Sequence, residues 1–98
     1  MIVGWVRPTL DEALERFAEL SDQLGELRVR EGETEYAELG ARRGAWFGST
    51  ESTVTGRGRD AEFAAIDHSM ELVRIRSDIR AVEAELRYLE HVIASWRP

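Results

Sequence analysis

From Ala61 to Trp96, positions that alternate four and three residues apart are apolar, with His68 as the one polar residue among them. This spacing is typical of a helix that buries one narrow apolar seam against another helix. No Pro or Gly interrupts the stretch, and a helix of this length spans roughly 54 Å at about 1.5 Å per residue. Such a helix needs a partner of similar length. Its seam positions are Ala61, Ala65, His68, Leu72, Ile75, Ile79, Val82, Leu86, Leu89, Ile93 and Trp96.

An earlier stretch has the same spacing and is the natural partner. Thr9 followed by Glu12 predicts a capping box, in which the Thr hydroxyl caps a free backbone N–H and the Glu reaches back. Asp11 and Glu12 also suit the positive end of a helix dipole. The apolar repeat that follows comprises Leu10, Ala13, Phe17, Leu20, Leu24 and Leu27.

The register of this first seam falters after Leu27, because the next seam positions hold Glu31 and Thr34. A new stripe, out of phase with the first, begins with Tyr36, Leu39 and Trp46. Interior glycines each weaken a helix by up to about 1 kcal/mol relative to Ala. We expect either a kinked continuous helix to about residue 47 or two helices broken near residue 32, and the length of the second helix favours continuity. The glycines concerned are Gly25, Gly32, Gly40 and Gly44.

Small polar residues and Gly predict a turn at about residues 48–55. Thr53 and Thr55 are candidate caps for the long helix, whereas Gly56 and Gly58 favour a later start with Asp60 as the cap. A β-hairpin at this point is an alternative. The predicted single domain, 1–98, therefore divides into an apolar arm at 1–8, a first helical arm at 9–47, a turn at 48–55 and a long helix at 56–96.

These patterns predict an all-α fold, a long antiparallel helical hairpin that resembles a coiled coil. Phe63, Ile66, Met70 and Val73 lie outside the seam of the long helix, whereas its second half narrows to the seam. We therefore expect a homodimer in which two hairpins associate near their turns to form a helical bundle. The predicted seam of the hairpin and bundle comprises Phe17, Leu20, Leu24, Leu27, Leu72, Ile75, Ile79, Val82, Leu86, Leu89 and Ile93.

The chain is acidic, with a formal net charge of −6, but its charge is unevenly distributed. Residues 11–40 hold ten acidic residues against three Arg, whereas residues 41–60 hold four Arg against two acidic residues. Repulsion from phosphates argues against general nucleic-acid binding by such a chain. The absence of Cys excludes disulfides and thiolate metal sites.

The apolar segment at residues 1–6, which includes Trp5, is too short for a membrane span or a signal-peptide core. We expect it to pack on a neighbour as an arm or a short strand. We also expect a soluble protein without a membrane partner, cytoplasmic by default.

Two acidic pairs in the first helix resemble the magnesium ligands of all-α nucleotide pyrophosphohydrolases. They comprise Glu12 with Glu15 and Glu19 with Asp22. All four positions face away from the seam, whereas metal ligands in helical bundles converge inward from several helices. We interpret them as a solvated acidic face. His68, at a seam position, is interpreted as a core histidine. We therefore predict no enzyme activity, no metal and no cofactor.

A cluster of basic and aromatic residues surrounds the predicted turn. Arg binds phosphates, and aromatic rings stack on unpaired bases, so the cluster is a candidate contact for single-stranded nucleic acid or for a protein partner. The alternative, which we favour, is that the aromatic residues cap the bundle while the Arg residues balance acidic neighbours. The cluster comprises Arg42, Arg43, Trp46, Phe47, Arg57 and Arg59.

Residues 33–96 resemble a family of small helical phage and prophage proteins. The resemblance lies in a Tyr-containing helix rich in Ala and Arg (35–46), then a Thr-Val-x-x-Arg segment (53–57) that opens a long Glu/Arg/Leu helix. It implies a phage accessory protein acting beside recombination or replication factors in the host cytoplasm, and it supplies no catalytic residue.

Trp46-Phe47-Gly48 is similar to the Trp-x-Gly turn of the secreted hairpins of type VII secretion systems. The C-terminal Tyr-x-x-x-Asp/Glu signal of that family is missing, because Val92 follows Tyr88 at the required spacing.

We therefore predict a non-catalytic helical interaction protein, a phage accessory or adaptor that acts by binding another macromolecule. A secreted type VII hairpin is the alternative. Two further alternatives are a single-stranded nucleic-acid-binding accessory and an acidic inhibitor of a host nucleic-acid enzyme, the latter suggested by residues 11–40.

Overall fold

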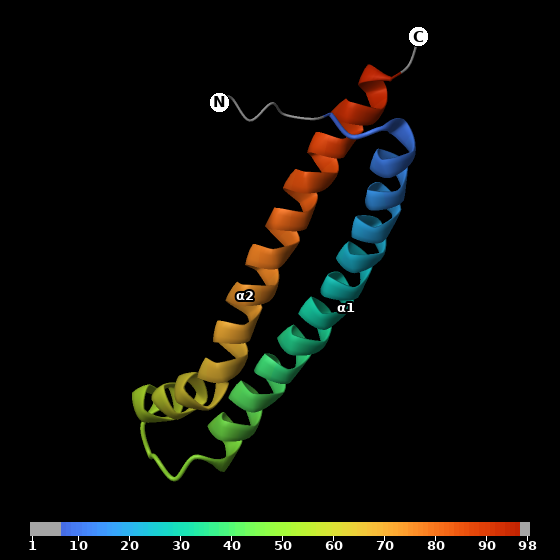
Figure 1. The fold of residues 1–98 in the computed structure, drawn as a ribbon. Helices are drawn as coiled ribbons and strands as arrows, with labels where there is room; N and C mark the ends of the chain where they lie inside the picture. The colour runs from blue at the N-terminus through green and yellow to red at the C-terminus, as the bar shows by residue number, and fades with distance from the viewer. Residues whose placement is uncertain (1–6, 97–98) are drawn as a thin grey trace.

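The computed structural model describes residues 7–96, which form two antiparallel helices (Figure 1). Helix α1 runs from Leu10 to Gly48 and helix α2 from Val54 to Ser95, and they pack against each other along their length. The predicted all-α helical hairpin is confirmed. The β-hairpin alternative is wrong, because residues 45–47 and 54–55 are helical. The predicted apolar arm at residues 1–6 lies outside the described residues.

Threonine caps begin both helices. The backbone N–H of Glu12 donates to Thr9 Oγ1 at 3.2 Å, and the Thr9 hydroxyl donates to the Glu12 carboxylate at 2.9 Å. The expected cap is therefore present, although the carboxylate accepts from the hydroxyl of Thr9. Thr53 caps α2 by accepting from the N–H of Gly56 at 3.0 Å. The later start of α2 at Asp60 is wrong, because one capped N–H offsets part of the cost of glycines in the first turns.

The expected change of phase in α1 is also wrong. The helix is continuous through Gly32, and its seam keeps the same heptad register to the turn. Tyr36 and Leu39 are 81% and 64% exposed. In a continuous helix, the position of each residue in the sequence fixes the face on which it lies. Tyr36 and Leu39 could therefore face α2 only if the seam residues before them faced away from α2. The seam positions in this part are half-buried and comprise Glu31, Thr34, Glu38, Ala41 and Ala45.

The apolar core occupies the part of the hairpin near the chain ends. Ala13, Leu20 and Leu27 of α1 pack there against the α2 seam, with Phe17, Leu24 and Ile93 half-buried at its edge. Val92 is buried more deeply than the predicted Ile93. The buried α2 residues of this core are Ile75, Ile79, Val82, Leu86, Leu89 and Val92.

A contact that the sequence pattern did not predict ties the beginning of the hairpin to its end. The Trp96 indole N–H donates to the carbonyl oxygen of Pro8 at 3.2 Å. The guanidinium of Arg7 lies over the same ring, 3.6 Å from its centroid, in a cation–π arrangement. Trp96 therefore holds the segment that leads into α1.

Candidate interaction surface in the turn half

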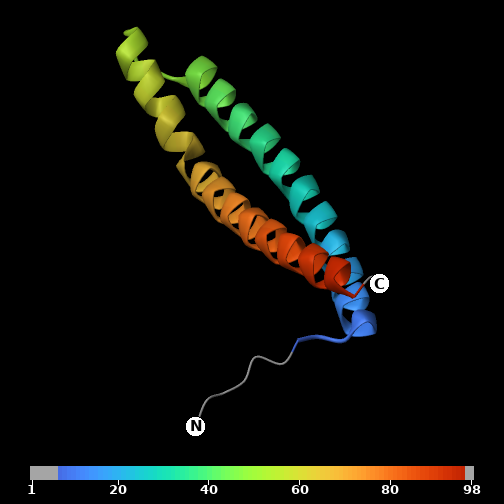
Figure 2. The same cartoon turned by 90° about the horizontal axis from the view of Figure 1, so that it is seen from above.

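The hairpin divides into two halves of different character. We call residues 10–27 and 75–96 the terminal half, and residues 28–48 and 54–74 the turn half. Figures 1 and 2 show that α2 changes direction in the turn half, between its yellow and orange segments. The two halves differ in where their apolar and charged side chains lie.

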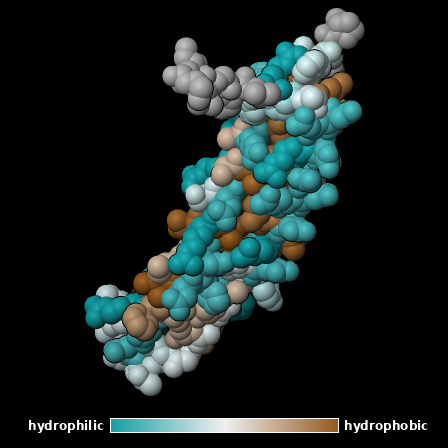
Figure 3. Space-filling model, in the orientation of Figure 1, coloured by the Kyte–Doolittle hydropathy of each residue, from teal (hydrophilic) through white to brown (hydrophobic). Residues whose placement is uncertain are grey.

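Among residues 7–96, every large apolar side chain that is at least half exposed lies in the turn half. Those exposed in the terminal half, such as Leu10 and Tyr88, are between 37% and 47% exposed. Figure 3 shows brown and tan apolar surface over the part of the molecule that contains the turn, and narrower brown areas between teal residues along the rest of the hairpin. The exposed set of the turn half comprises Val29, Tyr36, Leu39, Phe47, Val54, Phe63, Ile66, Met70 and Val73.

Between the helices of the turn half, in contrast, small and polar side chains predominate, and Leu72 is a large apolar exception. Only Ala61, Ala65 and Leu72 are buried there, all from α2. The Ser69 hydroxyl donates to the Glu38 carboxylate at 2.7 Å. Arg42 pairs with both Glu38 and a glutamate of α2, and it donates to Ser69 at 3.5 Å. The seam of this half therefore holds a polar network where the terminal half holds Leu and Ile.

Ion pairs continue this network toward the middle of the hairpin. Arg30 pairs with Glu71 at 2.9 Å. Arg76 donates to Glu35 at 2.6 Å and to Glu31 at 3.1 Å. The hydrogen bond that Arg76 donates to Glu35, and then the one it donates to Glu31, raise the pKa of Arg76 above its ordinary value. Because the pairs are solvent-exposed, they contribute little to stability individually.

Two exposed stripes of similar spacing run along the turn half. The α2 stripe consists of Phe63, Ile66, Met70 and Val73, at intervals of three, four and three residues on the side away from the seam. The α1 stripe has the same intervals and consists of Val29, Gly32, Tyr36 and Leu39. This interval is that of a coiled-coil seam, so each helix carries a second seam that no other part of the described chain covers. Comparing the residue spacing of the two stripes would have identified Val29 as a stripe residue from the sequence alone.

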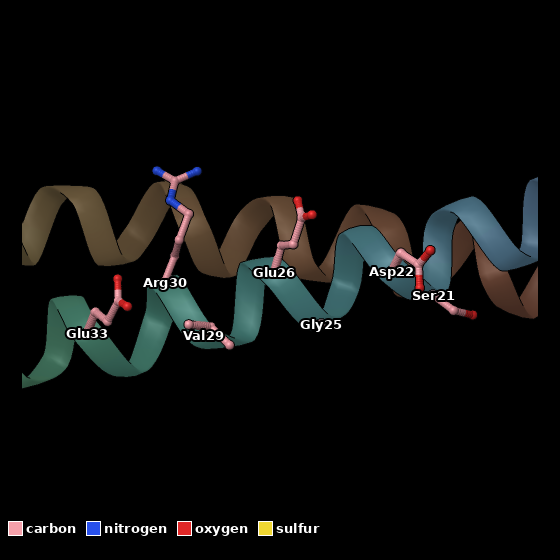
Figure 4. Close-up of a pocket in the computed structure, with 7 residues that line it drawn as sticks. All are labelled: Ser21, Asp22, Gly25, Glu26, Val29, Arg30 and Glu33. Carbon is pink, nitrogen blue, oxygen red and sulfur yellow. The ribbon is translucent and has the colours of Figure 1, made fainter.

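Two surface depressions lie beside these stripes. One is lined by Phe63 and Ile66 of the α2 stripe with three polar neighbours. The other lies on α1 near Gly25 and Val29, where the missing side chain of Gly25 leaves room (Figure 4). All its lining residues belong to one helix, so it is an open hollow on a rod that encloses no small molecule. They are Ser21, Asp22, Gly25, Glu26, Val29, Arg30 and Glu33.

The structure divides the predicted basic and aromatic cluster into two groups. Arg57 donates to the carbonyl oxygens of Glu51 and Trp46, at 3.1 and 3.3 Å, and so holds the turn. Arg42 belongs to the polar network described above. Trp46 is half-buried, whereas Arg43, Phe47 and Arg59 are exposed. Binding of single-stranded nucleic acid or of a protein partner by the six-residue cluster stays a prediction.

The acidic pairs of α1 do not form a metal site in this arrangement. The side chains of Glu12, Glu15, Glu19 and Asp22 are all exposed. Across residues 7–96, no three side chains of His, Asp or Glu gather closely enough to hold an ion. His68 is half-buried at its seam position.

No family model, curated protein or solved structure matches this chain, so its site is interpreted from its own residues. Within residues 7–96, neither helix contains an apolar stretch long enough to cross a bilayer.

Proposed function

We propose that the protein is a non-catalytic helical interaction protein whose turn half binds other protein molecules. The observation that supports this function is the reversed polarity of the turn half, with charged residues between the helices and apolar residues outside. Exposed contiguous apolar patches on soluble proteins mark interaction surfaces. Removing the apolar side chains of the two stripes from water would lower the free energy of the complex. The surrounding charged residues would form the polar rim of the interface.

A protein partner fits these surfaces better than a nucleic acid does. The chain carries a net charge of −6, and two of the four Arg residues near the turn, Arg42 and Arg57, already bond within the hairpin. The stripes themselves are apolar and have the spacing that a partner helix requires. A phage origin and action in the host cytoplasm, implied by the resemblance of residues 33–96, stay predictions.

Site-directed photo-crosslinking tests the proposal. A photoreactive amino acid replaces Leu39 or Met70 in the turn half, and Leu14 or Tyr88 in the terminal half as matched controls, since all four side chains are exposed. Illumination in lysate of the source cells should crosslink protein to the turn-half positions and much less to the controls. Equal crosslinking at all four positions would contradict the proposal.

A further inference from the structure

We infer that the α2 stripe is a self-association surface, which pairs with the α2 stripe of a second copy of the chain in antiparallel orientation. This inference rests on the proposed function, because it names one occupant for the interaction surface of the turn half. Its evidence is the apolar spacing of the stripe together with the order of charges along both of its edges.

The stripe matches itself when one copy is turned end for end. In an antiparallel coiled-coil pair, Phe63 faces the partner's Val73 and Ile66 faces the partner's Met70, with a two-fold axis between the centres of the two stripes. The interface would bury eight large side chains, four from each copy, and each of them is half or more exposed in a single hairpin. Such an interface lies at the small end of specific protein interfaces, about 1,000 Å² in total, so the dimer should dissociate on dilution.

The edges of the α2 stripe are acidic toward the turn and basic toward the middle of the hairpin. One edge carries Asp60, Asp67 and Arg74 at seven-residue intervals. In the antiparallel pair, Asp60 lies opposite the partner's Arg74, and symmetry repeats the pair. Asp60 also accepts a hydrogen bond from the Ser49 hydroxyl of its own hairpin at 2.6 Å, through one of its two carboxylate oxygens. Arg74 is largely exposed and has only a 3.8 Å pair with Glu71, so its guanidinium is free to reach across.

The other edge, formed by Glu62, Ser69 and Arg76, repeats this order. Glu62 lies opposite the partner's Arg76 and Ser69 opposite the partner's Ser69. Arg76 and Glu62 already take part in ion pairs with α1, so this edge contributes less than the first. The one unfavourable contact is between Asp67 and the partner's Asp67, close to the axis.

Other pairings of the two stripes fit less well. A parallel pair of α2 stripes would place Glu62 opposite the partner's Asp67, two like charges. An antiparallel pair of α1 stripes would place Arg28 opposite the partner's Arg42, and Glu33 opposite the partner's Glu33. Charge complementarity therefore selects the antiparallel α2 pair.

A parallel pair of α1 stripes has matching charges, since Arg28 would lie opposite the partner's Glu33. However, the α1 stripe offers only three large side chains, because Gly32 leaves a gap. Pairing through α2 leaves the α1 stripe of both copies open for a different protein.

Sedimentation equilibrium of the full chain over a hundredfold range of concentration tests the inference. The unmodified protein should exchange between monomer and dimer. Met70→Glu should raise the dissociation constant by about tenfold or more, because it places a charge opposite the partner's Ile66. Leu39→Glu, the matched change in the α1 stripe, should leave it unchanged. Both side chains are exposed, so circular dichroism should show an intact fold in both variants.

Exchange of charges tests the edge pairing. Asp60→Arg or Arg74→Asp alone should weaken the dimer, and the double variant should restore it. Asp67→Asn should strengthen it, because it removes the one like-charge contact.

Disulfide trapping tests the orientation, because the natural chain has no Cys. Asp67→Cys, near the axis, should form a disulfide-linked dimer on mild oxidation. Ser77→Cys, beyond the end of the stripe, should not, because the two copies of this position lie far apart in the antiparallel pair. Efficient linkage through Ser77→Cys would overturn the antiparallel orientation.

Two results would overturn the inference without contradicting the proposed function. One is a monomer at every concentration, in which case photo-crosslinking still decides whether the turn half binds other proteins. The other is a dimer that is sensitive to Leu39→Glu and insensitive to Met70→Glu, which would move the self-association surface to α1.

Discussion

The two halves of the hairpin use the same heptad geometry with opposite distributions of polarity. In the terminal half, Leu20 and Ile75 are each only 1% exposed, and the charged residues lie outside. In the turn half, Ser69 and Glu38 meet between the helices, and Tyr36 and Phe63 face water. The comparison teaches that heptad spacing determines which residues meet, whereas residue type determines whether that contact stabilises the hairpin. The terminal half should therefore supply most of the stability of the monomer.

The largest expected effect is truncation of the core in the terminal half. Leu20→Ala removes a buried side chain and leaves a cavity, which should lower the free energy of unfolding by about 2–5 kcal/mol. Leu39→Ala, the same change at an exposed position of the turn half, should lower it by less than about 0.5 kcal/mol. Urea denaturation of dilute protein measures both. Similar losses for the two variants would mean that the turn half has an apolar core of its own.

Glycines within the turn half should respond in opposite directions. A Cβ on Gly32 would meet no atom within 4 Å, so Gly32→Ala should raise the free energy of unfolding by about 0.5–1 kcal/mol. A Cβ on Gly56 would lie 2.9 Å from the Cβ of Glu51, so Gly56→Ala should lower it. Thermal unfolding compares the two variants. If Gly56→Ala stabilised the protein instead, Thr53 and Glu51 would be able to move away from the added Cβ without loss of stability.

Restoring an apolar residue to the seam of the turn half should stabilise it modestly. Thr34 is a half-buried seam position, so Thr34→Leu should raise the free energy of unfolding by about 0.5–1 kcal/mol. Glu33→Leu places the same side chain at the exposed neighbouring position and should have little effect. Hydrogen exchange should show slower exchange in residues 28–48 of the first variant only. Equal protection in both variants would argue against the seam register.

The smallest effect should come from the exposed ion pairs. Arg76→Gln removes two charged hydrogen bonds, and its effect on the free energy of unfolding should be close to the measurement error. The pKa of Arg76 is raised above an already high value, first by the hydrogen bond that it donates to Glu35. A raised pKa keeps the cation charged at all pH values below it, so these pairs should not weaken between neutral and mildly alkaline pH. A marked loss of stability in that range would contradict this assignment.

Short-range patterns predicted most of the fold. The heptad spacing of residues 61–93 and of Leu10–Leu27, with Thr9 as a cap, was sufficient for a helical hairpin because these signals depend on neighbours three or four positions away. The start of α2 was harder to predict, since the capping bond to Thr53 competes with the glycines that follow it. The sequence also failed to predict that Glu31 and Thr34 continue the seam of α1. Both are polar, so their positions were interpreted as a break in the apolar seam.

The candidate surface was predicted in part. The position of Phe63, Ile66, Met70 and Val73 outside the seam followed from their spacing, and they are exposed. The roles of Arg42 and Arg57 did not follow, because a long side chain selects among partners on the other helix and in the turn. Sequence shows that such a residue is charged, but the partner depends on the packing of segments far apart in the chain.

The amino-acid sequence by itself determined two long helices, their caps and the apolar face of the terminal half, because helix periodicity and hydrophobic burial act over a few neighbouring residues. Only the tertiary structure decided that α1 continues in one register, that Tyr36 and Leu39 face water, and that Trp96 holds Pro8. The physical reason is that α1 is a rigid helix. Once the core of the terminal half fixes the rotation of α1 about its own axis, the direction in which each later side chain points is fixed as well. The polarity of the turn half follows from that rotation.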